Sequence, residues 1–178
     1  MKKLIPLALC LIALPAAAHP GHAEASGLLA GLAHPFTGLD HLLALLGVGL
    51  WSRQQWQQQR RGMLVPAAFL LMMALGALVR VDVPIELGIA ASVVLIGALL
   101  ASALRVPTAA AIGLAGLFAL LHGQAHGREL AGMASMAGFL ASSAVLLMAG
   151  RAIDSKTASR IAGAAIGAAG LYLLAATA

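Results

Sequence analysis

Six long apolar segments follow one another along this chain and constrain its fold more than any other feature of the sequence. They cover residues 28–51, 63–79, 85–104, 107–125, 130–150 and 161–177. Each is close to the roughly 20 residues that an α-helix needs to cross about 30 Å of hydrocarbon. The segments are continuously apolar, without the alternation of barrel strands, so helices are favoured over a membrane β-barrel. The pattern predicts an all-α membrane protein in which residues 19–178 form a single six-transmembrane-helix bundle.

The scarcity of charged residues also favours a bilayer as the solvent. Charged residues make up 10% of the 178 residues and hydrophobic residues 61%, whereas a soluble domain carries about 25% charged residues. The formal net charge of +5 does not indicate a nucleic-acid partner, because the basic residues are dispersed and aromatic residues are scarce. Gly163 and Gly167 form a GxxxG pair in the last segment, which we interpret as tight packing within the chain rather than a dimer motif. The oligomeric state stays open.

Residues 1–18 have the three parts of a secretory signal peptide. Lys2 and Lys3 supply the positive start, residues 4–14 the apolar stretch, and residues 16–18 a small-residue cleavage site. Cleavage after Ala18 removes Cys10, the single cysteine of the chain, so disulfides and thiolate metal sites are excluded from the mature protein. An uncleaved first helix is the alternative.

The basic residues between the segments predict which side of the membrane each loop faces. A cleaved signal leaves the mature N-terminus in the periplasm, and six crossings return the C-terminus to the same side. The loops then assigned to the cytoplasm hold Arg53, Arg60, Arg61, Arg105, Arg151, Lys156 and Arg160, and the outer loops hold Arg80 and Arg128. This bias follows the positive-inside rule for a bacterial inner-membrane protein, and Trp51 is expected at the inner interface, as in an aromatic belt.

The histidines and most carboxylates fall in the outer half of this topology. All six histidines lie there, with every acidic residue except Asp154. The first group is His34, Asp40 and His41 in the stretch HPFTGLDH. On one helix His34 and His41 would share a face two turns apart, and counting back from Trp51 puts His41 roughly 15 Å deep, near the midplane. An ionisable residue at that depth is a functional candidate by default, with a hydrogen-bonded structural His–Asp pair as the alternative.

A second group ends the fourth segment, and Asp82 and Glu86 lie at the outer start of the third. We interpret Asp82 as a loop residue or a helix cap. His122, His126 and Glu129 share a face if the helix continues through Gly123 and Gly127, which are also positions where it could unwind. Imidazole and carboxylate ligands without thiolate suit nickel, cobalt, zinc or copper(II) and not magnesium or calcium, which take oxygen ligands. We therefore predict a graded line of metal ligands from the outer mouth to the midplane. From mouth to midplane it holds Glu86, His126, Glu129, His122, His41 and Asp40, with His34 beside the last two.

Two residues at the expected mature N-terminus, His19 and His22, have two interpretations. They either capture metal ahead of the membrane or belong to a flexible start. The Arg128–Glu129 pair likewise has a solvated loop pair as its alternative interpretation.

The two histidine-rich stretches resemble a known family. HPFTGLDH resembles the HPxxGxDH signature of the HupE/UreJ family, and LHGQAHGREL resembles that family's second histidine-rich segment. The resemblance implies a permease for nickel, or for cobalt, that serves hydrogenase or urease maturation, with a metallochaperone as the downstream partner and no prosthetic group. By position it implies metal contacts by His34, Asp40, His41, Glu86, His122, His126 and Glu129. The expected process is passage of Ni²⁺ from the periplasm to the cytoplasm.

Two other functions are compatible with the same residues. The family looks distantly related to intramembrane metal-dependent amidases, in which three histidines and an aspartate around zinc activate water; Ser92 or Ser102 would then assist. A periplasm-facing metal sensor or scaffold, which binds without transport, is the third hypothesis. We favour the permease over an enzyme because no residue is clearly poised as a general acid or base.

Overall fold

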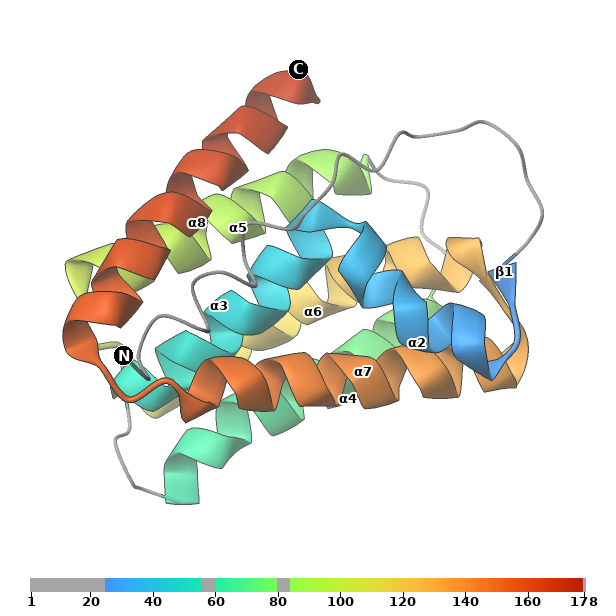
Figure 1. The fold of residues 1–178 in the computed structure, drawn as a ribbon, viewed down its shortest axis with the longest axis horizontal. Coiled ribbons are helices and arrows are strands. Elements are labelled where there is room, and N and C mark those ends of the chain that lie inside the picture. The colour runs from blue at the N-terminus through green and yellow to red at the C-terminus, as the bar shows by residue number, and fades with distance from the viewer. Residues whose placement is uncertain (1–24, 56–59, 80–83, 178) are drawn as a thin grey trace, which may run out of the picture.

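In the computed structural model, which describes residues 25–55, 60–79 and 84–177, the chain is a bundle of α-helices (Figure 1). The helices are α2 (Leu28–Thr37), α3 (Leu39–Gln55), α4 (Leu64–Leu78), α5 (Ile85–Ser102), α6 (Thr108–Glu129), α7 (Gly132–Ala152) and α8 (Lys156–Ala176). A short 3-10 helix, η1 (Arg60–Met63), precedes α4. Two-residue strands β1 (Ala25–Ser26) and β2 (Leu130–Ala131) pair in parallel and join the start of α2 to the α6–α7 connection. The expected signal peptide lies outside the described residues.

Five of the six predicted segments correspond to one helix each, and the first does not. The expected single helix over 28–51 is wrong, because α2 and α3 are separate helices bent by 83°. Pro35 lies inside α2 and Gly38 between the helices is extended, with φ −101° and ψ 119°. Proline removes one backbone N–H donor, and the extended residue ends the helical hydrogen-bond ladder, so the chain turns there.

Four helices, α5 to α8, are long and apolar enough to cross a membrane, and the bent pair α2 and α3 makes a fifth if it counts as one span. Helix α4 is apolar but has only 15 residues. Large apolar side chains point outward on these helices, with Leu78 80% and Met133 91% exposed. A surface of this kind is natural where lipid is the solvent, and the chain is a multi-pass helical membrane protein.

The helices pack in pairs through small residues. Gly97 of α5 faces the backbone of Gly163 and Gly167 of α8, and α4 and α6 approach in the same way. In lipid no hydrophobic effect drives helices together, so close backbone approach supplies the attraction. The GxxxG pair of α8 therefore packs within the chain, as the sequence analysis expected.

Large side chains from several helices fill the centre of the bundle. Trp51 of α3, Phe69 of α4 and Phe139 of α7 are each at most 1% exposed. The expectation that Trp51 lies in an aromatic belt is wrong, because its side chain is inside the protein. Trp51 packs on the inner face of α3 instead of facing lipid.

The bundle has two chemically different ends. The described basic residues Arg53, Arg105, Arg151, Lys156 and Arg160 lie where α3, α5 and α7 end and α8 begins. There the Arg53 Nη2 donates to Asp154 Oδ2 at 2.6 Å, and Arg160 Nε donates to the Ala101 carbonyl at 3.0 Å. The opposite end, where α4 and α6 end, carries Arg128 alone among the described lysines and arginines. The described basic residues of the loops assigned to the cytoplasm therefore lie together at one end of the bundle.

Candidate metal site

The break between α2 and α3 brings the first histidine group to the C-terminal part of α6. Helix α6 runs without interruption to Glu129, so His122, His126 and Glu129 lie on one face, as expected for a continuous helix. Gly123 and Gly127 do not unwind it; a Cβ atom at either position would strike the backbone of α4, at Met73 and Ala77. These glycines therefore let α4 pack closely while the histidines face α2 and α3.

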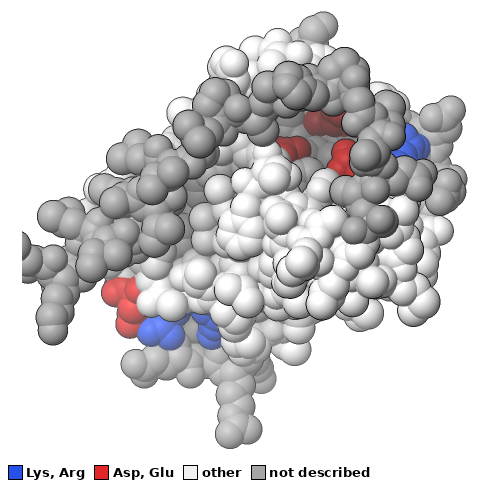
Figure 2. All heavy atoms as spheres, turned by 45° about the vertical axis from the view of Figure 1, so that its right-hand side comes forward, with Lys and Arg blue, Asp and Glu red and all other residues white. Residues whose placement is uncertain are grey.

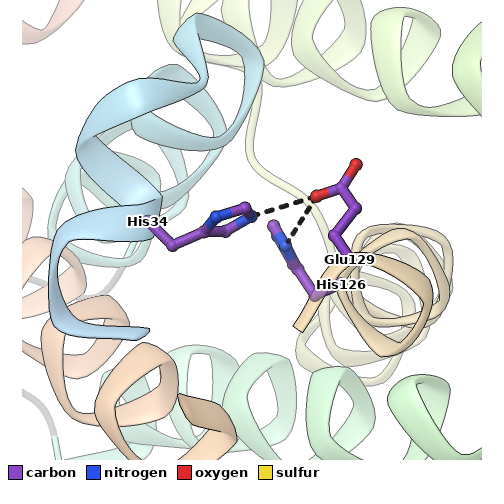
Figure 3. A group of neighbouring side chains, drawn as sticks. All are labelled: His34, His126 and Glu129. Carbon is purple, nitrogen blue, oxygen red and sulfur yellow. Dashed lines mark hydrogen bonds and ion pairs between the residues drawn. The ribbon is translucent and has the colours of Figure 1, made fainter. Parts of the chain in front are cut away.

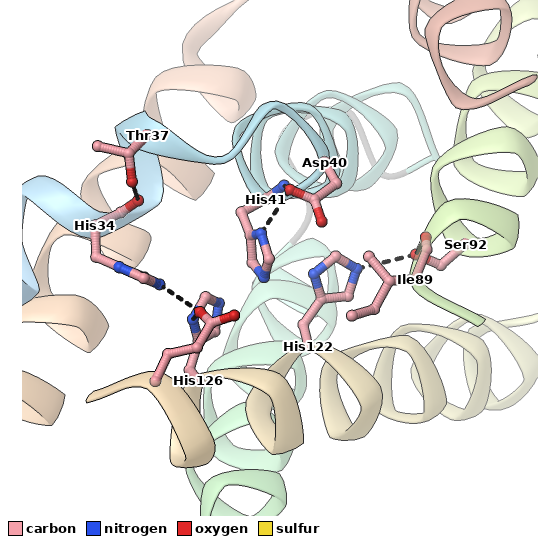
Figure 4. A network of polar contacts seen from close by, with 9 residues as sticks. His34, Thr37, Asp40, His41, Ile89, Ser92, His122 and His126 are labelled. Carbon is pink, nitrogen blue, oxygen red and sulfur yellow. Dashed lines mark hydrogen bonds and ion pairs between the residues drawn. The ribbon is translucent and has the colours of Figure 1, made fainter. Parts of the chain in front are cut away.

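Four histidine rings form one cluster inside the bundle (Figure 4). The ring centroids of His41 and His126 are 4.0 Å apart, those of His34 and His126 4.7 Å, and those of His41 and His122 4.8 Å. His126 is fully buried, His122 is 1% exposed and His41 9%. The rings thus form a row in the order His34, His126, His41, His122.

The outer part of the row contains a carboxylate (Figure 3). The Nε2–H of His34 donates to Oε2 of Glu129 at 3.0 Å, and Nδ1 of His126 lies 3.6 Å from the same oxygen. One ligand atom from each of His34, His126 and Glu129 fits within 4.8 Å of the others. Two imidazole nitrogens and one carboxylate oxygen at this spacing form a set that a transition-metal ion can bridge. We call these three residues the outer trio.

The inner part of the row is held by hydrogen bonds that face away from its centre. The Nδ1–H of His41 donates to Oδ1 of Asp40 at 2.7 Å, and the backbone N–H of His41 donates to the same oxygen at 2.8 Å. The Nε2 of His122 is 3.0 Å from the hydroxyl of Ser92. A carboxylate or hydroxyl on the distal nitrogen of a histidine orients the ring and leaves the other nitrogen for a metal ion.

Several of the buried ring nitrogens have no hydrogen-bond partner. These atoms are Nε2 of His41 and both Nδ1 and Nε2 of His126. An unsatisfied buried polar atom costs about 1–3 kcal/mol, so native proteins leave few of them. Buried imidazoles whose ring nitrogens make no hydrogen bond are the arrangement expected where a cation supplies the missing partner.

A cavity of about 220 Å³ leads to this row from the end opposite the basic residues. Asp40, His41, Glu86, Arg128 and Glu129 supply its charged and titratable lining, between α3, α5, α6 and α8. Figure 2 shows acidic side chains together in a hollow, with a basic side chain beside them. Three of the four described acidic residues line the cavity and one arginine does, so it favours cations.

The chain is similar to known proteins over nearly its whole length. The profile of the family described as HupE / UreJ protein matches residues 7–175. The chain belongs to the HupE/UreJ family. It is 37% identical, over 192 aligned positions, to Protein HupE of Rhizobium leguminosarum bv. viciae, and the alignment covers 96% of each chain. No solved structure matches it.

The two HupE/UreJ-like stretches of the sequence contribute the four histidines of the cluster. Their order along the row differs from the expected one at His34. His34 was expected beside Asp40 and His41; in the structure it contacts Glu129, 95 residues away. The bend at Gly38 causes this difference, because it separates His34 from the helix that carries His41. Glu86 lies in the cavity wall and outside the outer trio. His19, His22 and Asp82 lie outside the described residues.

One residue beside the histidine cluster, Ser92, has a structural role that the sequence did not reveal. Ser92 was considered as a helper in amide hydrolysis and is instead the hydrogen-bond partner of His122. Its signal in the sequence is a hydroxyl in the middle of an otherwise apolar helix, where it is fully buried. That signal is weak, because serine occurs on several helices of this chain with only backbone partners, as at Ser142.

Proposed function

We propose that this HupE/UreJ-family protein is a permease that carries Ni²⁺ from the periplasm to the cytoplasm, with Co²⁺ as the alternative cargo. The ion would supply hydrogenase or urease maturation through a cytoplasmic metallochaperone. One observation carries the proposal, namely a row of buried histidines, with unpaired ring nitrogens, at the base of an acidic cavity. Imidazole with some carboxylate favours late first-row divalent ions, which agrees with nickel or cobalt as the cargo.

The proposed placement is in the bacterial inner membrane, with six crossings after a cleaved signal peptide and both mature termini in the periplasm. Four long helices, the bent pair α2 and α3, and the short α4 would make the six. At 1.5 Å per residue, the 15 residues of α4 reach about 22 Å, so the bilayer would thin locally at this helix. The basic end of the bundle would face the cytoplasm.

The proposed route begins in the cavity and follows the histidine row. Glu86 and Glu129 raise the local concentration of cations at the cavity wall. The ion is taken up by the outer trio, and His126, whose ring lies between those of His34 and His41, passes it to the inner histidines. Each position has to bind well enough to accept the ion and weakly enough to release it.

The proposed driving force is the inward-negative membrane potential. For a divalent ion this potential supplies about 4.6 kcal/mol per 100 mV. The sequence contains no P-loop, the phosphate-binding motif of many ATPases. We therefore do not assign the driving force to a P-loop ATPase activity of this chain.

The test is uptake of radioactive nickel by cells that lack other nickel transporters. Asp40→Ala and His41→Ala should each reduce uptake to the background of cells without the protein, because they remove the inner ligand or the carboxylate that orients it. Asp154→Ala is the matched control, since this aspartate lies at the opposite end in an exposed pair with Arg53 worth about 0–1 kcal/mol. Uptake that is equal in all four proteins, at equal amounts in the membrane, would refute the permease.

An intramembrane amide hydrolase is the second candidate, and one contact bears on it. Ser92 contacts His122, but its hydroxyl hydrogen is donated to the Ile89 carbonyl at 2.7 Å. The serine is therefore an acceptor from the histidine and not a nucleophile activated by it. Ser102 is ten residues further along α5, about 15 Å away. Release of product from amide lipids by zinc-loaded protein would favour the hydrolase, and tight binding without flux would favour a sensor.

A further inference from the structure

A closed apolar layer lies between the histidine row and the basic end of the bundle. Leu45, Val48 and Trp51 follow His41 on one face of α3 at helical spacing, and each is at most 2% exposed. Phe69 of α4 belongs to the same buried cluster. From His41 to Trp51 the helix rises about 15 Å. A divalent cation would lose its hydration there without gaining ligands, so the route is closed toward the basic end, while the cavity leads to the row from the opposite end.

At the basic end, two glutamine side chains fasten α3 to the connection between α5 and α6. The amide of Gln55 bonds twice, since its Nε2–H donates to the Leu104 carbonyl and its Oε1 accepts from the backbone N–H of Val106 at 3.2 Å. The Nε2–H of Gln54 donates to the Leu100 carbonyl at 3.0 Å. We call Gln54 and Gln55 the glutamine latch. It consists of side-chain hydrogen bonds, which can break without disrupting a helix.

The contact of α3 with α7 is of another kind. A Cβ atom at Gly49 of α3 would strike the Leu147 carbonyl, and one at Gly150 of α7 would strike the Leu46 carbonyl. Backbones that approach so closely leave no side chains between them that could rearrange. We therefore expect α3 and α7 to move as one unit, and the contact of α3 with the α5–α6 connection to be the one that opens.

The closed layer contains one unsatisfied donor. The indole N–H of Trp51 is buried and has no hydrogen-bond partner among the described residues. A buried donor without an acceptor destabilises the arrangement that buries it, and water at the basic end would satisfy this one if the ring moved outward. The glutamine latch and the apolar packing thus hold the layer shut against a group that favours opening, as expected of an element with two arrangements.

We propose that the end of α3 at the basic side of the bundle is a gate, in which Trp51 blocks the route below the histidine row and the glutamine latch keeps it shut. Opening separates α3, together with α7, from the α5–α6 connection and lets the ion leave at the basic end. The proposal rests on the proposed permease for the direction of passage.

The test measures whether the glutamine latch controls access to the closed layer. Full-length protein with Cys10→Ser and Ala44→Cys carries a single thiol, at a fully buried position of α3 about one turn from His41. In detergent, a charged methanethiosulfonate should modify this thiol slowly. Gln55→Ala should accelerate the reaction by at least about tenfold, because two hydrogen bonds of the latch are lost. Mass spectrometry measures the rate, and an unchanged rate would overturn the proposal.

Trp51→Ala removes the block itself and leaves the glutamine latch in place. The folded variant should also expose the thiol at position 44, and a thiol that stays as slow as in the protein with Trp51 would overturn the role of this ring. Gln55→Ala leaves the apolar core intact, so the latch is tested even if the tryptophan variant does not fold.

Two controls distinguish a gate from general loosening. Arg160→Ala removes a hydrogen bond to the Ala101 carbonyl at the same end, without touching α3, and should leave the rate at position 44 unchanged. Ala90→Cys, in place of Ala44→Cys, puts the thiol in the cavity wall, where Gln55→Ala should not alter its rate. Acceleration by Arg160→Ala, or at position 90, would show that the whole bundle loosens and would refute a local gate.

These results separate the gate from the permease. If the thiol at position 44 responds to Gln55→Ala as expected but wild-type cells take up no nickel, the permease fails and the opening at the basic end stands. If wild-type cells take up nickel and the thiol does not respond, the gate fails and the permease stands.

Discussion

At the residue scale, the histidine row is a concentration of unsatisfied polar atoms in an otherwise well-packed interior. His126 is the extreme case, since it is fully buried and neither ring nitrogen has a hydrogen-bond partner. Its ring contacts that of Phe139, with centroids 3.8 Å apart and planes tilted by 49°, so an apolar side chain fits the same surroundings. A residue that lowers the stability of the metal-free protein is expected at positions where metal binding, and not folding stability, determines which amino acid is retained.

Replacement of His126 by leucine should therefore separate stability from binding. We expect His126→Leu to raise the free energy of unfolding of the metal-free protein by about 1 kcal/mol, because it removes two buried nitrogens that make no hydrogen bond. The same variant should lose the rise in melting temperature that Ni²⁺ gives the wild type. Thermal unfolding in detergent, with and without Ni²⁺, measures both effects. A variant that still gains the full nickel-dependent stabilisation would contradict the role of His126.

Metal binding at the row should also weaken in acid. A protonated imidazole has no lone pair for a metal ion, so protons compete with Ni²⁺ and the bound ion releases them. We expect nickel affinity to fall as the pH is lowered from neutral to about 4, because acid favours the protonated rings, which do not bind the ion. Calorimetric titration in buffers of different ionisation enthalpy measures the affinity and the protons released together. Affinity that is constant over this range would argue against imidazole ligands.

At the element scale, the break between α2 and α3 is what assembles the site. Each of the other five apolar segments could be predicted as a single helix, because continuous hydrophobicity is a local property of the sequence. The 83° bend could not; Pro35 and Gly38 indicated a loosened backbone, but its direction depends on how α2 packs against α7. The pairing of His34 with Glu129 follows from that bend, and for this reason spacing along the chain did not predict it.

Gly38 links the bend to the inner histidine. A Cβ atom at this position would lie 2.9 Å from both Asp40 Oδ1 and His41 Nδ1, the two atoms that hydrogen-bond to each other. Because these are side-chain atoms that can move, we expect Gly38→Ala to change the free energy of unfolding by no more than about 0.5 kcal/mol. Nickel affinity should nevertheless fall by about tenfold, since His41 loses its orientation.

Gly113→Ala is the matched control for this substitution, because a Cβ atom there has nothing within 4 Å. It should leave nickel affinity unchanged. The account of the bend is wrong if both alanine variants bind nickel as the wild type does.

At the scale of the whole molecule, the bundle is two-sided, with carboxylates and histidines toward one end and basic residues at the other. This sidedness could be predicted, because charge in loops and hydrophobicity in segments are read directly from the sequence. The depth of His41 in the membrane could not be predicted from the sequence in this way. It was counted from Trp51 as an interfacial residue, and Trp51 is buried in the core.

Helix α8 contributes to this architecture through close packing and not through ligands. Gly97→Ala would place a Cβ atom against the backbone of Gly163 and Gly167, which cannot move aside as a side chain can. We expect a loss of about 1–3 kcal/mol in the free energy of unfolding, with no change in the oligomeric state. Thermal unfolding and light scattering in detergent measure the two quantities. Unchanged stability together with a change in oligomeric state would instead assign these glycines to a contact between chains.

The most direct test of the central claim is nickel flux into liposomes that contain only the purified protein. With an inward-negative potential set by a potassium gradient and a fluorescent chelator inside, wild-type protein should admit Ni²⁺ at a rate that increases with the potential. His126→Leu should reduce this rate to that of protein-free liposomes, and Asp154→Ala should not. Wild-type protein that binds Ni²⁺ in detergent, yet gives liposomes no more flux than bare lipid, would contradict passage and leave a binding protein.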